Sequence, residues 1–331
     1  MRTSAYTRIP VIILAALALA ACPFKKDKKH DDDHGGGGST SPTYYVSVST
    51  GMDTNPGTQA SKFKTITHAM TVATSGSTVK VDPGIYDVLN NNETFPITVP
   101  AGVLLIGVDA NGVEANQGGG PSIVGRGPAP AGFAASSVTL LPGTGSTIAG
   151  FTITPDDASL GHDGLLLSNG SVTLRNNTVS GASRYGVEVG ASTDHVITGN
   201  QIVNNPGQGL GFINGGDRSK VEKNGITGNA FGVEYDVAGG DLGGGLAGSA
   251  GGNVITCNTY SDIVAMASTP ITINAANNFW DNWDNSSPTR SCNFTSDDIC
   301  DFNAGTPNAA NIITTGGAQA LSPPNPVCPN P

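Results

Sequence analysis

The chain has 331 residues, of which 46 are glycine and 13% are charged. Because 37% of the residues are apolar, the composition excludes a disordered chain. The formal net charge of -10, with no basic cluster after residue 29, argues against a nucleic-acid partner. Glycine lacks the period of collagen and is mixed with Asn and Thr, which favours a β protein with many tight turns.

The first residues have the pattern of an export signal. Arg2 and Arg8 form a short positive region. An uncharged apolar run, Val11–Ala21, follows it and is too short to span a bilayer. The run ends in Leu19-Ala20-Ala21-Cys22, which resembles the lipobox of bacterial lipoproteins, where the cysteine thiol takes a diacylglycerol. The resemblance implies that a signal peptide is removed and that Cys22 anchors the mature chain to membrane lipid.

The predicted signal peptide covers residues 1–21, and the lipidated Cys22 begins a polar, low-complexity linker that extends to residue 42. The His and Asp residues at 30–34 are a less favoured alternative as metal ligands, because a flexible site must be ordered on binding. Pro23 is not the Asp that commonly retains lipoproteins in the inner membrane. We therefore expect a cell-envelope location, and the outer membrane where the host has two membranes.

Four more cysteines, all in the last quarter of the chain, are disulfide candidates: Cys257, Cys292, Cys300 and Cys328. An even number of cysteines in an exported protein indicates two disulfides, and three pairings are open. No two of them have the CxxC spacing, so a zinc or redox site is not expected.

Beyond residue 160 the chain repeats itself with a period of about 22–23 residues. Each repeat begins with a glycine and an apolar segment, and these starts are Gly164, Gly186, Gly209 and Gly232. A second apolar segment in each repeat ends in an asparagine, which is Asn177, Asn200, Asn224 or Asn258. Asp262–Met266 is a fifth start, displaced by a Gly-rich insertion at 241–252 for which we expect a surface loop.

The repeat predicts a solenoid of strands. Segments of three to five residues with alternating polarity are too short for helices, and the repeat leaves no room for a crossover helix. Leucine-rich repeats are disfavoured because the inward positions hold several residue types, so each repeat is expected to be one coil of a parallel β-helix. Equivalent residues then stack about 4.8 Å apart, and the four repeat asparagines form a structural ladder of amide hydrogen bonds within a left-handed bend.

The pattern resembles the right-handed parallel β-helix of the pectin-lyase-like superfamily over about residues 43–285. Its most specific part is the run at 44–58, followed by Phe63-Lys64-Thr65-Ile66 and Pro83-Gly84-Ile85-Tyr86. This part resembles the N-terminal module of bacterial β-helix proteins that are grouped as a domain of unknown function. The fold class expected is all-β, a right-handed single-stranded parallel β-helix of about 22–23 residues per coil with an N-terminal helical cap.

The module also suggests how the coils begin. Apolar residues recur at helical spacing from Phe63 to Ala73, so a short helix is expected to cover the open apolar end. Thr78–Val81 is expected as the first coil strand. Asp53 and Asn55 are expected to fix a Gly-rich turn, with calcium binding as the alternative.

At the other end, Asn277–Trp280 resembles the closing motif of bacterial β-helix repeats. The expected domains are therefore a β-helix with its cap over residues 43–290 and a Cys-containing tail over residues 291–331.

Candidate functional residues are sought among outward side chains, because the fold alone predicts function poorly. Alternation along the strands that begin with glycine predicts one column of outward residues, one from each strand: Leu166, Glu188, Gly211 and Glu234. The acidic Asp236 lies beside the last of these, and the basic Arg184 precedes the second strand. Glu188 and Glu234 lie two coils apart, about 9.5 Å, at the upper edge of the carboxylate separation of inverting glycosidases. Gly211 between them is expected to leave room for a sugar.

Several interpretations of this column are open. In the first, four residues are the candidates for catalysis: Arg184, Glu188, Glu234 and Asp236. In the second, the carboxylates hold a Ca²⁺ ion that bridges to an acidic glycan. In the third, they only make an exposed strand soluble. The run at 156–164 resembles polygalacturonase signatures, but there the paired Asp and the His come from successive coils. No base matches a lyase motif, and the acidic surface repels polyuronate.

The sequence therefore favours a monomeric, lipid-anchored cell-envelope protein that binds an extended ligand such as a polysaccharide without catalysis. No cofactor or metal is expected, apart from the alternative of Ca²⁺. The competing hypothesis is a carbohydrate-active enzyme, either a pectate-lyase-like polysaccharide lyase or an inverting glycoside hydrolase. A surface adhesin with a protein partner is a third possibility, for which the chain offers no motif.

Overall fold

A computed structural model describes residues 41–157, 159–190, 194–215, 218–280, 299–301, 312–317 and 319–320. The chain divides into two compact units, residues 1–40 and 41–331, and the described residues all belong to the second. The predicted signal peptide, Cys22 and most of the linker lie outside the described residues, as do Cys292 and Cys328.

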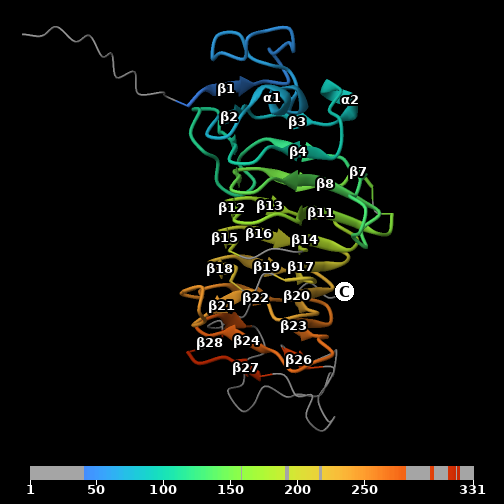
Figure 1. The fold of residues 1–331 in the computed structure, drawn as a ribbon, viewed down its shortest axis with the longest axis vertical. Helices are drawn as coiled ribbons and strands as arrows, with labels where there is room; N and C mark the ends of the chain where they lie inside the picture. Colours follow the sequence, from blue (N-terminus) through green and yellow to red (C-terminus); the bar gives the residue numbers. More distant parts are fainter. Residues whose placement is uncertain are drawn as a thin grey trace, which may run out of the picture. The chain divides into compact units, whose positions relative to one another are not determined.

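Three sheets run through the described unit, and successive strands of the chain enter them in turn (Figure 1). Sheet A contains β1 (Thr43–Val46), β2 (Thr78–Val81), β5 (Leu104–Gly107), β9 (Thr147–Ala149), β12 (Thr173–Arg175), β15 (Val196–Thr198), β18 (Lys220–Glu222), β21 (Asp241–Gly243), β24 (Thr272–Ala275) and β27 (Ile312–Thr314). Sheet B contains β3 (Ile85–Tyr86), β6 (Ser122–Val124), β10 (Thr152–Thr154), β13 (Thr178–Val179), β16 (Gln201–Val203), β19 (Gly225–Thr227), β22 (Val254–Thr256), β25 (Phe279–Trp280) and β28 (Gln319–Ala320). Sheet C contains β4 (Ile97–Val99), β8 (Ser137–Pro142), β11 (His162–Leu167), β14 (Tyr185–Val189), β17 (Gln208–Phe212), β20 (Phe231–Tyr235), β23 (Ser261–Ala265) and β26 (Ile299–Asp301), with β7 (Gly127–Pro128) antiparallel to β8.

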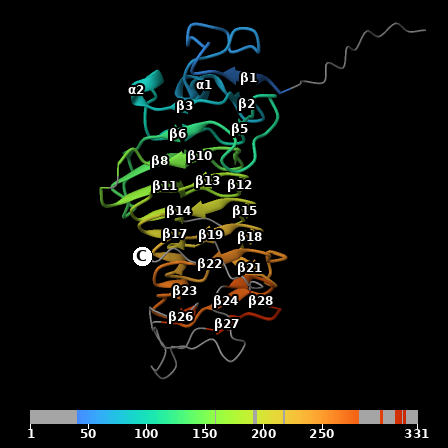
Figure 2. The same ribbon diagram turned by 180° about the vertical axis from the view of Figure 1, so that it is seen from behind.

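Strands of successive coils pair in parallel within each sheet, as the view from behind also shows (Figure 2). For example, Leu165 of β11 lies opposite Val187 of β14, which lies opposite Leu210 of β17. The protein is therefore an all-β, right-handed parallel β-helix, which is the predicted fold class.

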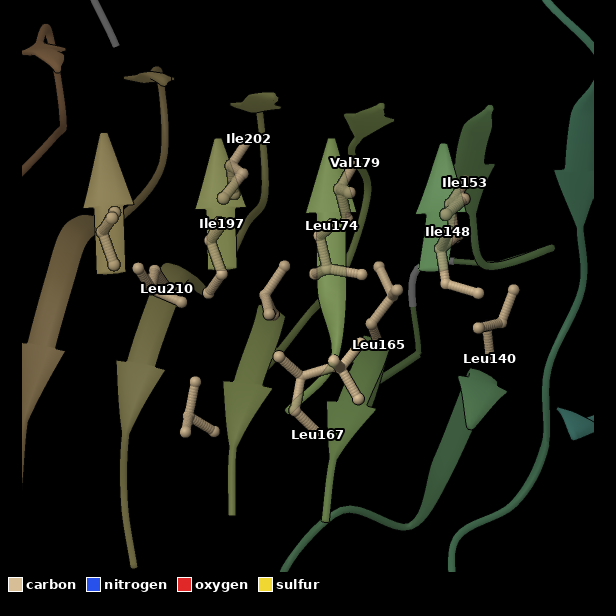
Figure 3. Packing of buried hydrophobic residues seen from close by; sticks show 14 of the residues in the cluster. Leu140, Ile148, Ile153, Leu165, Leu167, Leu174, Val179, Ile197, Ile202 and Leu210 are labelled. Atoms are coloured by element: carbon tan, nitrogen blue, oxygen red, sulfur yellow. The ribbon is translucent and has the colours of Figure 1, made fainter. Parts of the chain in front are cut away.

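Stacks of aliphatic side chains fill the space between the three sheets (Figure 3). Ile148, Leu174 and Ile197 come from successive strands of sheet A and are at most 1% exposed. Ile153, Val179 and Ile202 form the matching stack in sheet B. Because each coil removes a similar set of methyl groups from water, neighbouring coils stabilise one another through the same contacts.

Asn177, Asn200 and Asn224 form the predicted ladder. The side-chain oxygens of Asn200 and Asn224 accept hydrogen bonds of 2.9–3.1 Å from the main-chain and side-chain amides of the asparagine one coil before them. The side-chain oxygen of Asn177, at the start of the ladder, accepts one from the main-chain amide of Phe151. Asn253 and Asn278 continue the same ladder. The buried bends between sheets A and B thus have their amide groups satisfied.

The prediction that Asn258 is the fourth member of that ladder is wrong. Asn258 belongs to a second ladder, in which its oxygen accepts from Asn229, and Asn229 accepts from Asn205. The Gly-rich insertion delays Asn253, and Asn258 resembles the earlier asparagines because it follows an apolar segment, but that segment is β22 of sheet B rather than a strand of sheet A. The left-handed residues are also those just before the ladder asparagines, such as Asn176 (φ 55°) and Lys223 (φ 58°).

The N-terminal end is capped as expected, with one additional strand. Helix α1 (Ile66–Val72) buries Ile66, Ala69 and Met70, while the carboxylate of Glu93 accepts hydrogen bonds from the first amides of the helix. Asp53 accepts from the main chain at 64 and 65, so it fixes the turn as predicted. β1 pairs with β2, which is therefore the second strand of its sheet rather than the first. A short helix, α2 (Val88–Asn91), follows β3.

The boundary predicted at residue 290 is wrong, because the coils continue past it. β26, β27 and β28 pair in parallel with β23, β24 and β25, one in each sheet. Their sequence lacks the Gly and Asn spacing of the preceding repeats, so the period does not reveal them. Cys257 is in a disulfide, and the pairing of the four cysteines lies outside the described residues. Among the described residues, no helix is long and apolar enough to cross a membrane.

Candidate functional site

The outward column lies on sheet C, but its carboxylates are not exposed. Glu188 is 1% exposed and Glu234 is 4% exposed, and Leu166 is fully buried. A Cβ atom on Gly190 would lie 2.5 Å from the ring of Phe133, which comes from the loop between β7 and β8, and 3.3 Å from Leu166, so both side chains lie over Gly190. The interpretation of Glu188 and Glu234 as solubilising residues on an exposed strand is therefore wrong.

Arg184 lies between two buried carboxyl groups. Its Nη1 is 2.6 Å from Oδ2 of Asp163 and 2.5 Å from Oε2 of Glu188. Burial and the hydrogen bond with Glu188 raise the pKa of Asp163 to about 9, although the charge of Arg184 opposes the shift. One guanidinium thus faces two carboxyl groups, of which one carries a proton at neutral pH.

The space expected above Gly211 is filled by the ring of Tyr185. A Cβ atom on Gly211 would lie 2.4 Å from Cε1 of that ring. Burial, followed by the charge of Glu234, raises the pKa of Tyr185 far above its usual value, so the phenol keeps its proton. It donates a 2.7 Å hydrogen bond to Oε1 of Glu234, and Gln208 Nε2 donates one of 2.7 Å to Oε2.

The sequence therefore identified Arg184, Glu188 and Glu234 as one group but missed Asp163, Tyr185 and Gln208. We call these six residues the outward polar cluster. The register was the available signal, since Asp163, Tyr185 and Gln208 occupy equivalent positions at the starts of β11, β14 and β17. Alternation alone assigns those positions to the interior, which is why they were not considered.

The cluster has little capacity for hydrolysis. An inverting mechanism needs two free carboxyl groups with a sugar and a water molecule between them, whereas Glu188 is paired with Arg184 and Glu234 is bonded to Tyr185 and Gln208. Asp236 is the most accessible acidic neighbour, and burial together with Glu234 raises its pKa to about 6. No group of three or more His, Cys, Asp or Glu in the described part of the chain has a geometry suited to a metal ion.

A second group of polar side chains includes residues of the polygalacturonase-like run at 156–164. Asp157 and His162, five residues apart in the sequence, are brought within 3.3 Å of each other beside Arg126. His162 also lies opposite Ser137 of the neighbouring coil, because β8 pairs with β11. The spacing argument excluded the signature of that family, but it did not exclude a cluster of different composition.

An open cavity of about 360 Å³ lies beside the first coils. Its lining includes Tyr45 and Lys80, which are opposite each other on β1 and β2, and the main chain at 109–112. Lys62 and Asp82 form a 2.5 Å ion pair in its wall. We call it the N-terminal cavity. No sequence pattern indicates this cavity, because its residues come from four separate segments.

The family described as "Protein of unknown function (DUF1565)" matches residues 49–289. The chain belongs to this family. No curated protein matches the chain. The description of the family assigns no activity to its members.

Among solved structures, the chain is similar to pectate lyase Pel9A, with 15% identity, a TM-score of 0.42, and coverage of 86% of this chain and 80% of that one. It is also similar to the pectin methylesterase from Aspergillus niger, with 12% identity, a TM-score of 0.44, and coverage of 86% and 91%. A rhamnogalacturonan lyase shows 13% identity, a TM-score of 0.35, and coverage of 84% and 62%.

Proposed function

We propose that this protein is a lipid-anchored cell-envelope β-helix that binds an extended glycan without cleaving its glycosidic bonds. The observation that supports glycan binding most directly is the N-terminal cavity. A volume of about 360 Å³ lies at the lower end of the range for small-molecule sites and suits one or two sugar rings.

The lining of this cavity has the chemistry that sugars require. Tyr45 is partly exposed and offers an aromatic face for the apolar side of a sugar ring. Gln59 and Asp109 supply hydrogen-bonding groups, and Lys80 forms no ion pair with any other described residue. Because the cavity is open, a longer chain of sugars would extend from it along the coils.

The same reasoning disfavours the enzyme alternative at the outward polar cluster. The carboxylates of Glu188 and Glu234 are each held by buried partners, and Tyr185 occupies the volume that a sugar would need. Substrate entry would require the loss of at least one buried, charge-assisted hydrogen bond. We therefore place the glycan at the N-terminal cavity and assign the cluster to stability.

The test is a glycan screen of the mature chain, with and without Ca²⁺, that measures both retention and product formation. We expect retention of at least one glycan, no new reducing ends and no unsaturated products. Tyr45→Ala and Lys80→Ala should weaken retention at least tenfold. Lys64→Ala is the matched control, since Lys64 lies nearby but outside the cavity lining.

Product formation that disappears in Glu188→Gln or Glu234→Gln would instead establish an enzyme. Retention that is indifferent to Tyr45→Ala and Lys80→Ala would place the glycan elsewhere on the coils. The absence of retention and product would contradict the proposal and favour a protein partner.

The membrane anchor is a separate part of the proposal and rests on the lipobox-like sequence at Cys22. The mature chain should partition into detergent and carry a diacylglycerol on its first residue, detected by mass spectrometry of the N-terminal peptide. Cys22→Ser should release it from the membrane fraction. An unmodified Cys22 in a membrane-free protein would contradict the anchor and leave the glycan proposal unaffected.

A further inference from the structure

The strongest unexplained arrangement is a group around His162, on the outer side of the start of sheet C. We call Arg126, Ser137, Asp157, Ser159 and His162 the His162 cluster. His162 is the first residue of β11 and is 5% exposed, and Ser137 is the first residue of β8 in the coil before it. Arg126 lies between β6 and β7, whereas Asp157 and Ser159 lie in the connection from β10 to β11.

The contacts of His162 define its tautomer. Nη1 of Arg126 is 2.9 Å from Nε2 of His162, and a guanidinium can only donate. Nε2 therefore carries the lone pair, and the ring proton is on Nδ1. Nδ1 is hydrogen-bonded to Oγ of Ser137, which accepts that proton and fixes the orientation of the ring.

The hydroxyl of Ser159 lies beside Nε2 of His162, the ring nitrogen that carries the lone pair. Its Oγ lies 2.6 Å from Nε2 of His162, within the range of a nucleophile and its general base. Ser159 is exposed, as is the neighbouring Leu160, whose side chain offers an apolar contact beside the hydroxyl. The arrangement has the three parts of a serine nucleophile site: an accessible hydroxyl, a buried imidazole and a group that orients the imidazole.

Arg126 supplies a positive charge at the same hydroxyl. Its Nη1 is 3.2 Å from Oγ of Ser159, so the charge lies where an oxyanion would form after attack on a carbonyl. Oδ1 of Asp157 also lies 2.6 Å from this Oγ, so Asp157 and Nε2 of His162 compete for the single hydroxyl proton. The hydrogen bonds from Ser159, aided by the charge of Arg126, keep the pKa of Asp157 below its usual value. Asp157 therefore remains ionised beside Arg126.

We propose that Ser159 is a nucleophile, with His162 as its base, that hydrolyses small O-acyl esters at the surface of the β-helix. The Arg126 N–H first leaves Nε2 of His162 and turns to the carbonyl oxygen of the ester, which frees the lone pair of Nε2. Oγ of Ser159 then attacks the ester carbonyl while its proton passes to Nε2, and Arg126 stabilises the oxyanion. The C–O bond to the alcohol breaks, and the alcohol leaves with the proton from Nε2. Water, deprotonated by the same nitrogen, then releases the carboxylic acid and restores Ser159.

The test uses the intact mature protein and a fluorophosphonate probe, which forms a stable bond to an activated serine with loss of fluoride. We expect one adduct per chain, assigned to Ser159 by peptide mapping, together with slow hydrolysis of p-nitrophenyl acetate. Ser159→Ala should abolish both signals, and His162→Gln should slow labelling at least 100-fold. Ser136→Ala is the matched control, because the Ser136 hydroxyl only bonds main-chain oxygens of the adjacent coil.

His162→Gln replaces a buried side chain, so its folding must be checked by circular dichroism. Arg126→Gln is the second variant, because Arg126 is partly exposed, and we expect it to slow ester hydrolysis at least tenfold. Failure of an excess of probe to label Ser159 would overturn the proposal. So would labelling at an unchanged rate in folded His162→Gln and Arg126→Gln. Neither result depends on whether the N-terminal cavity binds a glycan.

Discussion

The hydroxyl of Tyr185 donates a 2.7 Å hydrogen bond to Glu234 across Gly211, which lies in the strand between them. The aromatic ring thereby fills the gap between the two glutamates of the outward column. Two carboxylates at a spacing near that of an inverting glycosidase are consequently parts of a packed surface rather than the two sides of a cleft.

The first prediction concerns this packing. Gly211→Ala places a methyl group 2.4 Å from Cε1 of Tyr185, so it should lower the free energy of unfolding by about 1–3 kcal/mol. Urea denaturation followed by circular dichroism measures the change. Gly170→Ala is the control, because a Cβ there has no atom within 4 Å, and it should change stability by less than about 0.5 kcal/mol.

In a Tyr185→Ala background, the cost of Gly211→Ala should largely disappear, because the colliding ring is absent. An equal cost in both backgrounds would show that Tyr185 does not occupy the space above Gly211.

The second prediction concerns the ion pairs of Arg184. Arg184→Met leaves Asp163 and Glu188 buried without a cation, and should lower the free energy of unfolding by about 3–5 kcal/mol. Arg218→Met removes an exposed pair with Asp194 and should cost less than about 1 kcal/mol. Chemical denaturation of both variants gives the comparison.

Adding Asp163→Asn and Glu188→Gln to Arg184→Met should recover part of the lost stability, since the uncompensated negative charge that the two carboxyl groups share is then removed. If Arg184→Met and Arg218→Met have the same small effect, Arg184 does not stabilise the buried carboxyl groups.

The coils after residue 160 were predictable because each repeat needs glycine at one place and asparagine at another. A Cβ on Gly186 would lie 2.8 Å from Nδ2 of Asn205, and the same conflict arises between Gly209 and Asn229. The glycines thus make room for the second ladder, and their spacing marks the coils. The earlier coils carry no such glycine period, so their strands were not predicted beyond Thr78–Val81 and the turn at Pro83.

The outward polar cluster was less predictable for a related reason. Strict alternation along β14 would make Tyr185 and Val187 both face the core. In the structure Gly186 faces the core together with Val187, so two successive residues point inward and the alternation is broken. Tyr185 is thereby turned outward over Gly211. The alternation of residues along a strand also says nothing about burial of the outer face of the sheet, which depends on contacts such as that of Phe133 with Gly190.

The third prediction tests the first asparagine ladder. Asn200→Ala removes the acceptor of two Asn177 amides and the donor to the main chain of Leu174. Because these groups are buried, the free energy of unfolding should fall by about 3 kcal/mol or more. Asn204→Gly is the control in the same coil: Asn204 is exposed with a φ of 54°, which glycine adopts freely, so little stability should be lost. Equal effects in urea denaturation would argue against a structural ladder.

The fourth prediction is a loss of stability in acid that depends on His195. This residue is fully buried, and Nδ1 accepts a 3.2 Å hydrogen bond from the Val172 amide. Burial lowers the pKa of His195 to about 4, although the charge of Asp194 opposes the shift. The folded protein therefore keeps the ring neutral at pH values where the unfolded chain already binds a proton.

The stabilisation is fully present above about pH 6.5, the ordinary histidine pKa, and is lost as the pH falls toward 4. The shift corresponds to at most about 3 kcal/mol. The pKa of Asp163 is raised, so its contribution to the free energy of unfolding increases as the pH falls from 6.5 toward 4, opposite to that of His195. The wild type must therefore be compared with His195→Asn at each pH, and not only with itself at neutral pH. From pH 7 to pH 4.5, the unfolding free energy of the wild type should fall by about 2 kcal/mol relative to that of His195→Asn. An NMR titration of the His195 ring with a midpoint near 6.5 would contradict this assignment, because a ring that titrates normally in the folded state cannot lose stability in acid by this route.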